Sequence, residues 1–265
     1  MSSFFNNKVV WVTGASSGIG EALAYQLSQL GAKIIISARR ENELERVKNN
    51  CTNKENIFVL PLDLLQKETF KSISEKAITK FGKIDILVNN GGQSQRSTSL
   101  ETTEEIERQL MEINYFSHVA LSKLVLPQMI KNGYGQIVVV SSIAGKFGFF
   151  FRSSYSAAKH ALHGYFESLR LENFKNNIHV LLVCPGKIKT NVSLNAVSTN
   201  GEKHAVMDKS HESAMSAEKC AEIMLNAMQK HKEEVFIGGG ELKAVWIKRI
   251  FPTLFAKLIK KQKPE

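Results

Sequence analysis

The sequence has few cysteines, and the three that it has, Cys51, Cys184 and Cys220, stand far apart in the chain. Such spacing fits neither a disulfide framework nor a zinc site, so a reducing, intracellular compartment is expected. The sequence also lacks an apolar run long enough to span a bilayer, and its beginning, MSSFFNNKVVWVTG, has no basic stretch followed by a long apolar one. We therefore expect a cytoplasmic protein without a secretion signal or a transmembrane anchor.

Acidic residues are fewer than basic ones. The sequence has 25 Asp and Glu and 35 Lys and Arg, which give a formal net charge of +10. Nucleic-acid-binding proteins carry such charge, but here the lysines are spread over many segments and no motif interleaves them with aromatic residues. We attribute the excess to a solvated surface and an anionic cofactor, and we expect no nucleic-acid partner. The chain also lacks a linker and an internal repeat, so residues 1–265 are expected to form a single α/β domain.

Short runs rich in Val and Ile alternate with segments in which apolar residues recur at helical spacing. The runs are almost continuously hydrophobic, as strands are when helices cover both faces of a parallel sheet. This alternation predicts a Rossmann-type, doubly wound α/β fold with about seven strands. The expected strands lie in KVVWVTG, AKIIISAR, NIFVLPLD, KIDILVNN, GQIVVVSS, IHVLLVCP and EEVFIGGG, and the expected helices span 18–30, 67–81, 103–130, 154–174 and 217–230.

The least regular stretch, residues 191–216, is polar and poor in large apolar side chains. A loop of this length in a compact domain is typical of a lid or a mobile segment. A surface insertion without a functional role is the alternative.

A glycine-rich turn, TGASSGIG, ends the first expected strand and begins the first expected helix. Backbone N–H groups and the positive end of the helix meet there, and glycines let a pyrophosphate approach the backbone closely. The spacing differs from the common G-x-G-x-x-G form, so a tight turn without a ligand is the alternative. The residues expected to bind a dinucleotide here are Gly14, Ser16, Ser17, Gly18, Ile19 and Gly20.

Two arginines, Arg39 and Arg40, follow the second expected strand. An acidic residue would be expected there if the site held the ribose 2'-hydroxyl of NAD. Guanidinium groups instead match the oxygens of a 2'-phosphate, so the sequence favours NADP over NAD. Surface arginines at a helix start are the alternative interpretation.

An acid/base pair is suggested by Tyr155 and Lys159, which are four residues apart and so share one face of an expected helix. The pKa of a tyrosine is about 10, and a nearby ammonium would favour the phenolate. Ser142 follows the fifth expected strand, where it can hydrogen-bond a substrate oxygen at the rim of the ligand crevice. A solvated helix face is the alternative for a Tyr-x-x-x-Lys pair taken alone.

These motifs together resemble the short-chain dehydrogenase/reductase family, over residues 6–240. The resemblance rests on TGASSGIG, NNGG at 89–92, EINYFS, VVVSSIAG, YSAAK at 155–159 and PGKIKT at 185–190. The run SARRENELERVK is also locally similar to the member 7 group of animal dehydrogenase/reductases. The resemblance implies a single-domain oxidoreductase that associates as a homodimer or homotetramer.

The family's functional residues can be carried over onto the matching positions. The implied catalytic tetrad is Asn114, Ser142, Tyr155 and Lys159, in which Asn114 would hold a water and Lys159 would also bind the nicotinamide ribose. Asp63 would contact the adenine ring. The further residues implied to bind the cofactor are Leu64, Asn90, Gly91, Gly92, Pro185, Gly186, Ile188 and Thr190.

Two departures from the family pattern stand out. NNGG replaces the more usual NNAG, which adds backbone freedom without removing a functional group. Position 17 carries a serine, where many NADP-dependent members have a basic residue, so the NADP prediction depends on Arg39 and Arg40 alone.

The phenylalanine-rich segment 146–152, between Ser142 and Tyr155, is expected either to line a pocket for an apolar substrate or to pack between subunits. No histidine pair has metal-ligand spacing together with a third ligand, so no metal site is expected. Cys184 ends an apolar strand and is expected to be a buried small apolar residue rather than a nucleophile.

Residues 242–263 combine apolar residues at helical spacing with lysines and an arginine. This basic, amphipathic pattern is typical of a helix lying on an anionic bilayer, so a peripheral membrane contact is one hypothesis. A helix docked on a neighbouring subunit or on the chain's own core is the alternative.

The sequence thus predicts an NADP-dependent oxidoreductase that interconverts a carbonyl and an alcohol by hydride transfer, most simply a reductase of an apolar ketone or aldehyde. An NAD-dependent alcohol or hydroxysteroid dehydrogenase is the alternative among enzymes. A nucleotide-binding regulator without turnover is the alternative from another class, although Ser142, Tyr155 and Lys159 would have no purpose in it.

Overall fold

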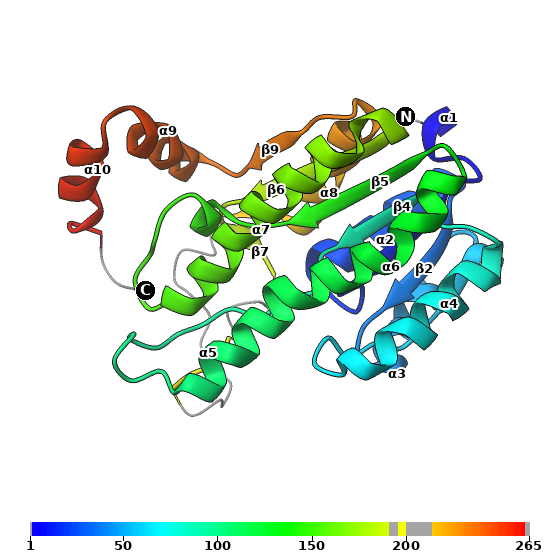
Figure 1. Ribbon diagram of the computed structural model, residues 1–265, viewed down its shortest axis with the longest axis horizontal. Helices are drawn as coiled ribbons and strands as arrows, with labels where there is room; N and C mark the ends of the chain where they lie inside the picture. Colours follow the sequence, from blue (N-terminus) through cyan, green and yellow to red (C-terminus); the bar gives the residue numbers. More distant parts are fainter. Residues whose placement is uncertain (1, 191–195, 200–213, 263–265) are drawn as a thin grey trace.

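A parallel sheet of seven strands forms the centre of the computed structural model, which describes residues 2–190, 196–199 and 214–262 (Figure 1). The strand order is β3-β2-β1-β4-β5-β6-β9, and every neighbouring pair runs parallel. The predicted doubly wound fold is therefore confirmed. The strands are β1 (Val9–Thr13), β2 (Lys33–Ser37), β3 (Ile57–Val59), β4 (Ile86–Asn89), β5 (Gly135–Val140), β6 (Ile178–Pro185) and β9 (Glu234–Ile237).

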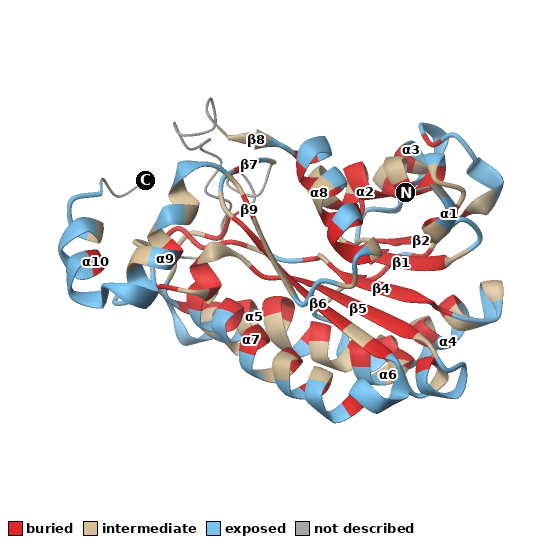
Figure 2. Cartoon of the chain, turned by 90° about the horizontal axis from the view of Figure 1, so that it is seen from above, coloured by how far each residue is buried: buried red, intermediate tan, exposed pale blue. Residues whose placement is uncertain are grey.

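Helices cover both faces of the sheet (Figure 2). One face carries α2 (Gly18–Gln29), α3 (Glu41–Asn49) and α8 (Ala217–Gln229). The opposite face carries α4 (Phe70–Phe81), α5 (Glu104–Met111), α6 (Ser117–Lys131) and α7 (Ser153–Asn173). Short helical segments lie at α1 (Ser2–Phe5), η1 (Lys54–Asn56), η2 (Lys67–Thr69), η4 (Ile143–Gly145), η5 (Phe174–Asn176) and η7 (Gly240–Leu242).

Each strand sends alternate side chains into two separate cores. In β1, Val10 and Val12 join the core beneath α2 and α8, whereas Val9 and Trp11 join the core beneath α6 and α7. All four side chains are essentially inaccessible to solvent, which is why the strand reads as a continuous apolar run.

The helix expected over 103–130 is interrupted by the π-helical turn η3 (Glu112–Phe116), which separates α5 from α6. The C-terminal segment forms two helices, α9 (Lys243–Ile250) and α10 (Pro252–Ile259). Pro252 begins α10 because proline is tolerated in the first turn of a helix but not in its interior. Both helices extend from the end of the sheet (Figure 1).

The stretch expected to form a lid, 191–216, lies largely outside the described residues. The short strand β7 (Ile188–Lys189) precedes it and pairs in parallel with β8 (Met215–Ser216), which forms its end. Among the described residues, no helix is long and apolar enough to cross a membrane.

Candidate active site

A cleft of about 380 Å³ opens at the carboxyl ends of β1, β4, β5 and β6. The strand order reverses at this edge between β1 and β4, where doubly wound sheets bind their ligands. Every residue that the sequence assigns to catalysis or to the cofactor lines this cleft, except Gly20. A side chain at Gly20 would collide with the carbonyl of Gly14, so this glycine allows the turn to close rather than facing the cleft.

The glycine turn after β1 and the NNGG segment after β4 support each other. Gly14 has a φ of +67°, and a Cβ atom there would lie 2.7 Å from the Cα of Gly91. Asn90 Nδ2 donates to the carbonyls of Thr13 and Gly14 over 3.0 and 3.3 Å. The Thr13 hydroxyl accepts from the backbone N–H groups of Asn90 and Gly91. These bonds hold the glycine-rich turn against the segment that follows the neighbouring strand β4.

The first turn of α2 can receive an anion. Its N-cap residue, Ser17, makes no side-chain capping bond, so the N–H groups at this helix end lack that intrachain acceptor. Gly18 begins the helix with a φ of +58°, a conformation that favours glycine. Open N–H groups and the positive helix end fit a nucleotide pyrophosphate.

The departure from NNAG has a physical reason in the structure. A Cβ atom at Gly91 would lie 2.6 Å from Cδ1 of Leu64. The Leu64 side chain therefore fills the space that an alanine methyl at this position would occupy. Leu64 also lines the cleft, as does Asp63, whose Oδ1 accepts from the backbone N–H of Leu65.

Arg39 and Arg40 are exposed at the rim of the cleft, just after β2. Arg40 Nη2 donates to the Ser16 hydroxyl over 3.5 Å, so this guanidinium lies above the glycine turn. Nearby, Arg46 forms ion pairs with Glu21 and Glu43 and also donates to the carbonyl of Ser16. Arg46 is thus a third arginine at the glycine-rich turn, in addition to Arg39 and Arg40.

The expected tetrad comes together from three elements. Tyr155 and Lys159 lie on α7, Ser142 follows β5 and Asn114 lies in the π-helical turn η3. The Ser142 hydroxyl donates to the carbonyl of Pro185 over 3.4 Å. Ser142 also acts to lower the pKa of Tyr155, and Lys159 Nζ lies 5.7 Å from the centre of the Tyr155 ring. π-Helical turns are frequent at functional sites, which agrees with the position of Asn114.

Asn114 is fully buried and holds the loop after β4. Its Nδ2 donates to the carbonyls of Gln93 and Leu110, and its Oδ1 accepts from the N–H of Gln93. A Cβ atom at Gly92 would lie 2.8 Å from this Oδ1 and 3.6 Å from Lys159 Nζ. The loop therefore brings the amide oxygen of Asn114 and the ammonium of Lys159 to the same small region.

Burial is the largest influence on the pKa values of Tyr155 and Lys159. It raises the pKa of Tyr155, against the opposing effects of Ser142, Arg152 and Arg96. Burial also lowers the pKa of Lys159 to about 7, and its Nζ donates to the carbonyl of Val140 over 2.8 Å. Burial thus acts against the ammonium of Lys159, the cation that the sequence predicts to favour the phenolate, while Arg152 and Arg96 also act to lower the pKa of Tyr155.

Gln95 is a residue that the motif analysis missed. Its side chain is fully buried, and its Oε1 accepts from the backbone N–H groups of Ser154 and Tyr155 over 3.0 and 3.2 Å. Its Nε2 reaches three hydroxyls, those of Ser97, Thr102 and Ser153. Gln95 thereby caps the start of α7, where Tyr155 stands. The polar run QSQRS directly after NNGG was the available signal, but the direction of the Gln95 side chain cannot be read from spacing.

A second missed residue, Ser141, links α7 to the end of β5. Its hydroxyl donates to the carbonyl of Lys159 over 3.1 Å and lies 3.0 Å from Nε2 of His163. Burial, followed by the charge of Lys146, lowers the pKa of His163 to about 3, so its ring is neutral near pH 7. Cys184 is buried, as expected, and burial raises the pKa of its thiol.

The phenylalanine-rich segment does not line the cleft. Phe147 is buried against Phe255 of α10, with 5.0 Å between ring centres, and Val245 of α9 joins the same cluster. Phe147 thus packs on the chain's own C-terminal helices. The apolar pocket and the subunit contact that the sequence suggests for the segment stay predictions.

Comparison with known proteins decides the family. A family model described as short chain dehydrogenase matches residues 8–201. This chain belongs to the short-chain dehydrogenase/reductase family. A solved short-chain dehydrogenase from Streptomyces avermitilis has a TM-score of 0.82 and 29% identity, covering 96% of both chains.

Curated relatives refine the placement within the family. Human dehydrogenase/reductase SDR family member 7 is 44% identical over 235 residues, which are 86% of this chain and 69% of that protein. An Anopheles gambiae protein, dehydrogenase/reductase SDR family protein 7-like, is 38% identical over 97% of this chain and 83% of its own length. These findings confirm the local resemblance to the member 7 group. The chain is an oxidoreductase that acts on carbonyl or alcohol groups of small molecules with a nicotinamide nucleotide.

We predict that Gln95→Ala lowers kcat about 100-fold while changing KM far less, because the start of α7 and the Tyr155 hydroxyl shift from their positions. Gln95→Glu keeps an acceptor for the two N–H groups, and the three hydroxyls can turn to donate to it, so this variant should recover much of the rate. The measurement is nicotinamide absorbance during turnover of a reactive aromatic ketone.

Gln136→Ala is the matched control, since Gln136 is equally buried but donates to the carbonyl of Met228 on the far side of β5. It should lower the melting temperature with an unchanged kcat. Equal losses of kcat in the Gln95 and Gln136 variants would show that Gln95 acts only on stability.

Proposed function

We propose that this chain reduces an apolar ketone or aldehyde with NADPH, and that Tyr155 donates the proton to the carbonyl oxygen. The observation that carries the cofactor choice is the end of β2, where Arg39 and Arg40 stand at the cleft and positions 38–40 contain no acidic residue. Two guanidinium groups at this position favour a 2'-phosphate over a bare ribose hydroxyl.

Reduction of a carbonyl would use Tyr155 as the acid. Because burial raises its pKa, the phenol keeps its proton near neutral pH and is ready to act as an acid. Ser142, which lines the same cleft as Tyr155, would hold the same substrate oxygen, and Lys159 and Asn114 lie near the phenol. A bound nicotinamide supplies the hydride in this scheme.

We predict that the purified protein binds NADPH at least 10-fold more tightly than NADH, and that Arg39→Ala/Arg40→Ala removes this preference, because each lost charged hydrogen bond weakens binding by about 1.5–3 kcal/mol. The measurement is nicotinamide fluorescence during separate titrations of the two cofactors.

Arg108→Ala is a matched control, since this arginine lies on α5 and pairs with Glu104 away from the cleft. It should leave both affinities unchanged. Tighter binding of NADH that the double variant does not alter would support the NAD-dependent alcohol or hydroxysteroid dehydrogenase instead.

We predict that Tyr155→Phe abolishes measurable turnover while keeping NADPH affinity within about 3-fold, because it removes the proton donor and little else. Tyr165→Phe, on the same helix α7, is the control and should keep the full rate. Unchanged turnover in Tyr155→Phe would contradict this role. NADPH binding by the natural chain, without turnover of any carbonyl in a broad panel, would favour the regulator.

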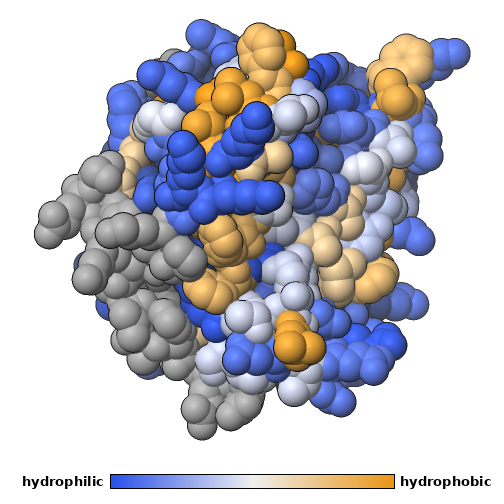
Figure 3. Space-filling model, turned by 90° about the vertical axis from the view of Figure 1, so that its left-hand side faces the viewer, coloured by the Kyte–Doolittle hydropathy of each residue, from blue (hydrophilic) through white to orange (hydrophobic). Residues whose placement is uncertain are grey.

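We further propose that α9 and α10 attach the protein to an anionic bilayer. Their inward side chains, among them Val245 and Phe255, already pack against the body of the protein. A docked helix would normally turn polar residues outward, yet large apolar side chains also lie outside (Figure 3). These exposed residues are Trp246, Ile250, Phe251, Leu254 and Leu258, between 41% and 61% accessible.

The positive charge of the C-terminal segment also favours an anionic bilayer. Basic residues alternate with the exposed apolar ones, and residues 242–262 contain no Asp or Glu. Each Lys or Arg near an anionic membrane adds roughly 1 kcal/mol to binding. The basic residues of α9, of α10 and of the turn after α10 are Lys243, Lys248, Arg249, Lys257, Lys260 and Lys261.

This surface also supports an apolar substrate. Phe147, which contacts Phe255 of α10, lies in the segment that runs from Ser142 to Tyr155. A bilayer beneath α9 and α10 would therefore bring apolar carbonyl compounds close to the catalytic residues.

We predict that Phe251→Ser/Leu254→Ser lowers partitioning onto phosphatidylserine-containing vesicles about 100-fold, because burial of each side chain contributes about 1.5–3 kcal/mol. Co-sedimentation with these vesicles and with purely zwitterionic ones measures the effect. Leu100→Ser, an exposed leucine in a distant loop, is the control. Equal, negligible pelleting of the natural chain and the double variant would remove the membrane hypothesis.

We also propose a homodimer or homotetramer formed through the central helices, in a reducing, intracellular compartment. Phe116, Leu171 and Phe174 are exposed on the helical layer of α6 and α7, which supports such a contact. All three cysteines are buried and unpaired, which supports a reducing environment.

A further inference from the structure

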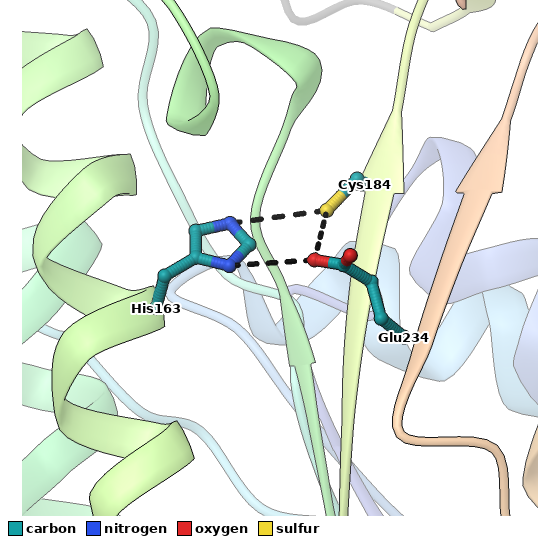
Figure 4. Close-up of side chains that lie close together, drawn as sticks. All are labelled: His163, Cys184 and Glu234. Carbon is teal, nitrogen blue, oxygen red and sulfur yellow. Dashed lines mark hydrogen bonds and ion pairs between the residues drawn. The ribbon is translucent and has the colours of Figure 1, made fainter. Parts of the chain in front are cut away.

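Three side chains from distant parts of the chain meet beside the active site (Figure 4). His163 lies one turn after Lys159 on α7, Cys184 is the residue before Pro185 on β6, and Glu234 begins β9. Cys184 Sγ lies 3.7 Å from Glu234 Oε1 and 3.8 Å from His163 Nε2, and His163 Nδ1 lies 3.5 Å from the same Oε1. Among the described residues, this is the group whose donor atoms could hold a metal ion.

The hydrogen-bond network decides which nitrogen of His163 faces the cluster with a lone pair. Ser141 has a single hydroxyl proton, which it donates to the carbonyl of Lys159, so its oxygen accepts from Nε2–H of His163. The other nitrogen, Nδ1, is then an acceptor, and it is buried without a hydrogen-bond partner. It points at two carboxylates, those of Glu234 at 3.5 Å and Glu167 at 3.7 Å.

A lone pair that faces carboxylate oxygens is repelled by them, and a proton or a metal ion between them would remove that repulsion. His163 itself is only 8% accessible, so solvent does not satisfy this nitrogen. The arrangement of Ser141 and His163 is also the one that metal-ligating histidines adopt, in which the other ring nitrogen donates to a fixed acceptor.

The donor set suits zinc, as do the two ligand spacings that involve the carboxylate oxygen of Glu234. Zinc bonds of about 2.0 to 2.3 Å place the ligand atoms of a tetrahedral site about 3.3 to 3.6 Å apart. The spacings of 3.5 Å from Nδ1 to Oε1 and 3.7 Å from Sγ to Oε1 are close to these values. A thiol with an imidazole favours zinc-like cations over magnesium and calcium, which prefer oxygen ligands.

A positive group already stands at the cluster. Lys146 Nζ lies 2.6 Å from Glu234 Oε1, the oxygen that faces both Cys184 and His163. Lys146 and Glu234 are partly exposed, which gives a cation a path from solvent. A metal ion would displace this ammonium and replace the thiol proton of Cys184, which passes to solvent.

We propose that His163, Cys184 and Glu234 form a binding site for a zinc-like divalent cation. This departs from the expectation of no metal site, which rested on spacing along the chain. The three ligands would tie α7, β6 and β9 together next to Lys159 and Pro185, and solvent would take the fourth position.

The test uses Co²⁺ as the probe on the full-length natural chain, because thiolate bound to cobalt absorbs in the near ultraviolet. We expect this absorption in the natural chain and in Cys220→Ser, a control that removes another buried thiol. Cys184→Ser should lose the absorption and weaken binding about 100-fold or more, and addition of Zn²⁺ should displace the cobalt from the natural chain. NADPH binding by each variant checks that it has folded.

Lys146→Met keeps all three ligands and removes the competing ammonium, so we expect it to bind Co²⁺ about 10-fold more tightly than the natural chain. Absence of the cobalt–thiolate absorption from the natural chain, or its persistence in Cys184→Ser, would overturn the proposal. No readout in this experiment depends on turnover, so its failure is distinguishable from a failure of the proposed reductase activity.

Discussion

The active site depends on one close approach of two backbones, between Gly14 after β1 and Gly91 after β4. Any side chain at either position would collide with the other segment or with Leu64. Asn90 then donates to the carbonyls of Thr13 and Gly14, so the glycine-rich turn is held by the segment after the neighbouring strand as well as by its own loop. Because β1 and β4 lie where the strand order reverses, this contact sets the floor of the cleft.

Helix α7 positions much of the remaining chemistry from one rigid element. Tyr155, Lys159 and His163 follow one another at four-residue intervals and so lie along one side of the helix. Gln95 holds the first turn through two N–H groups, and Ser141 binds the carbonyl of Lys159 further along. The helix is therefore fixed at two points to loops that follow β4 and β5. Sites supported in this way on regular elements keep their geometry better than sites built on loops.

Much of this arrangement could be predicted from the sequence, for reasons that are local. Strands buried on both faces read as apolar runs, and the glycine turn and Tyr155 with Lys159 carry fixed spacings. Gln95 could not be found in this way, because its importance lies in the direction of its side chain. His163, Cys184 and Glu234 are separated by long stretches of chain and meet only through the packing of α7, β6 and β9. The pKa values of Tyr155 and Lys159 could not be foreseen either, since burial, which decides them, is a property of the fold.

The C-terminal helices show how a pattern can support two interpretations at once. An amphipathic segment is expected to bury one apolar face, either on the protein or on a membrane. Here Val245 and Phe255 bury one face against Phe147, and a second apolar face remains outside. Since Phe147 stands in the connection from Ser142 to Tyr155, the inner face is part of the scaffold of the active site. The outer face can then meet a membrane without a rearrangement of the helices, because the contacts that fix them to the protein are already made.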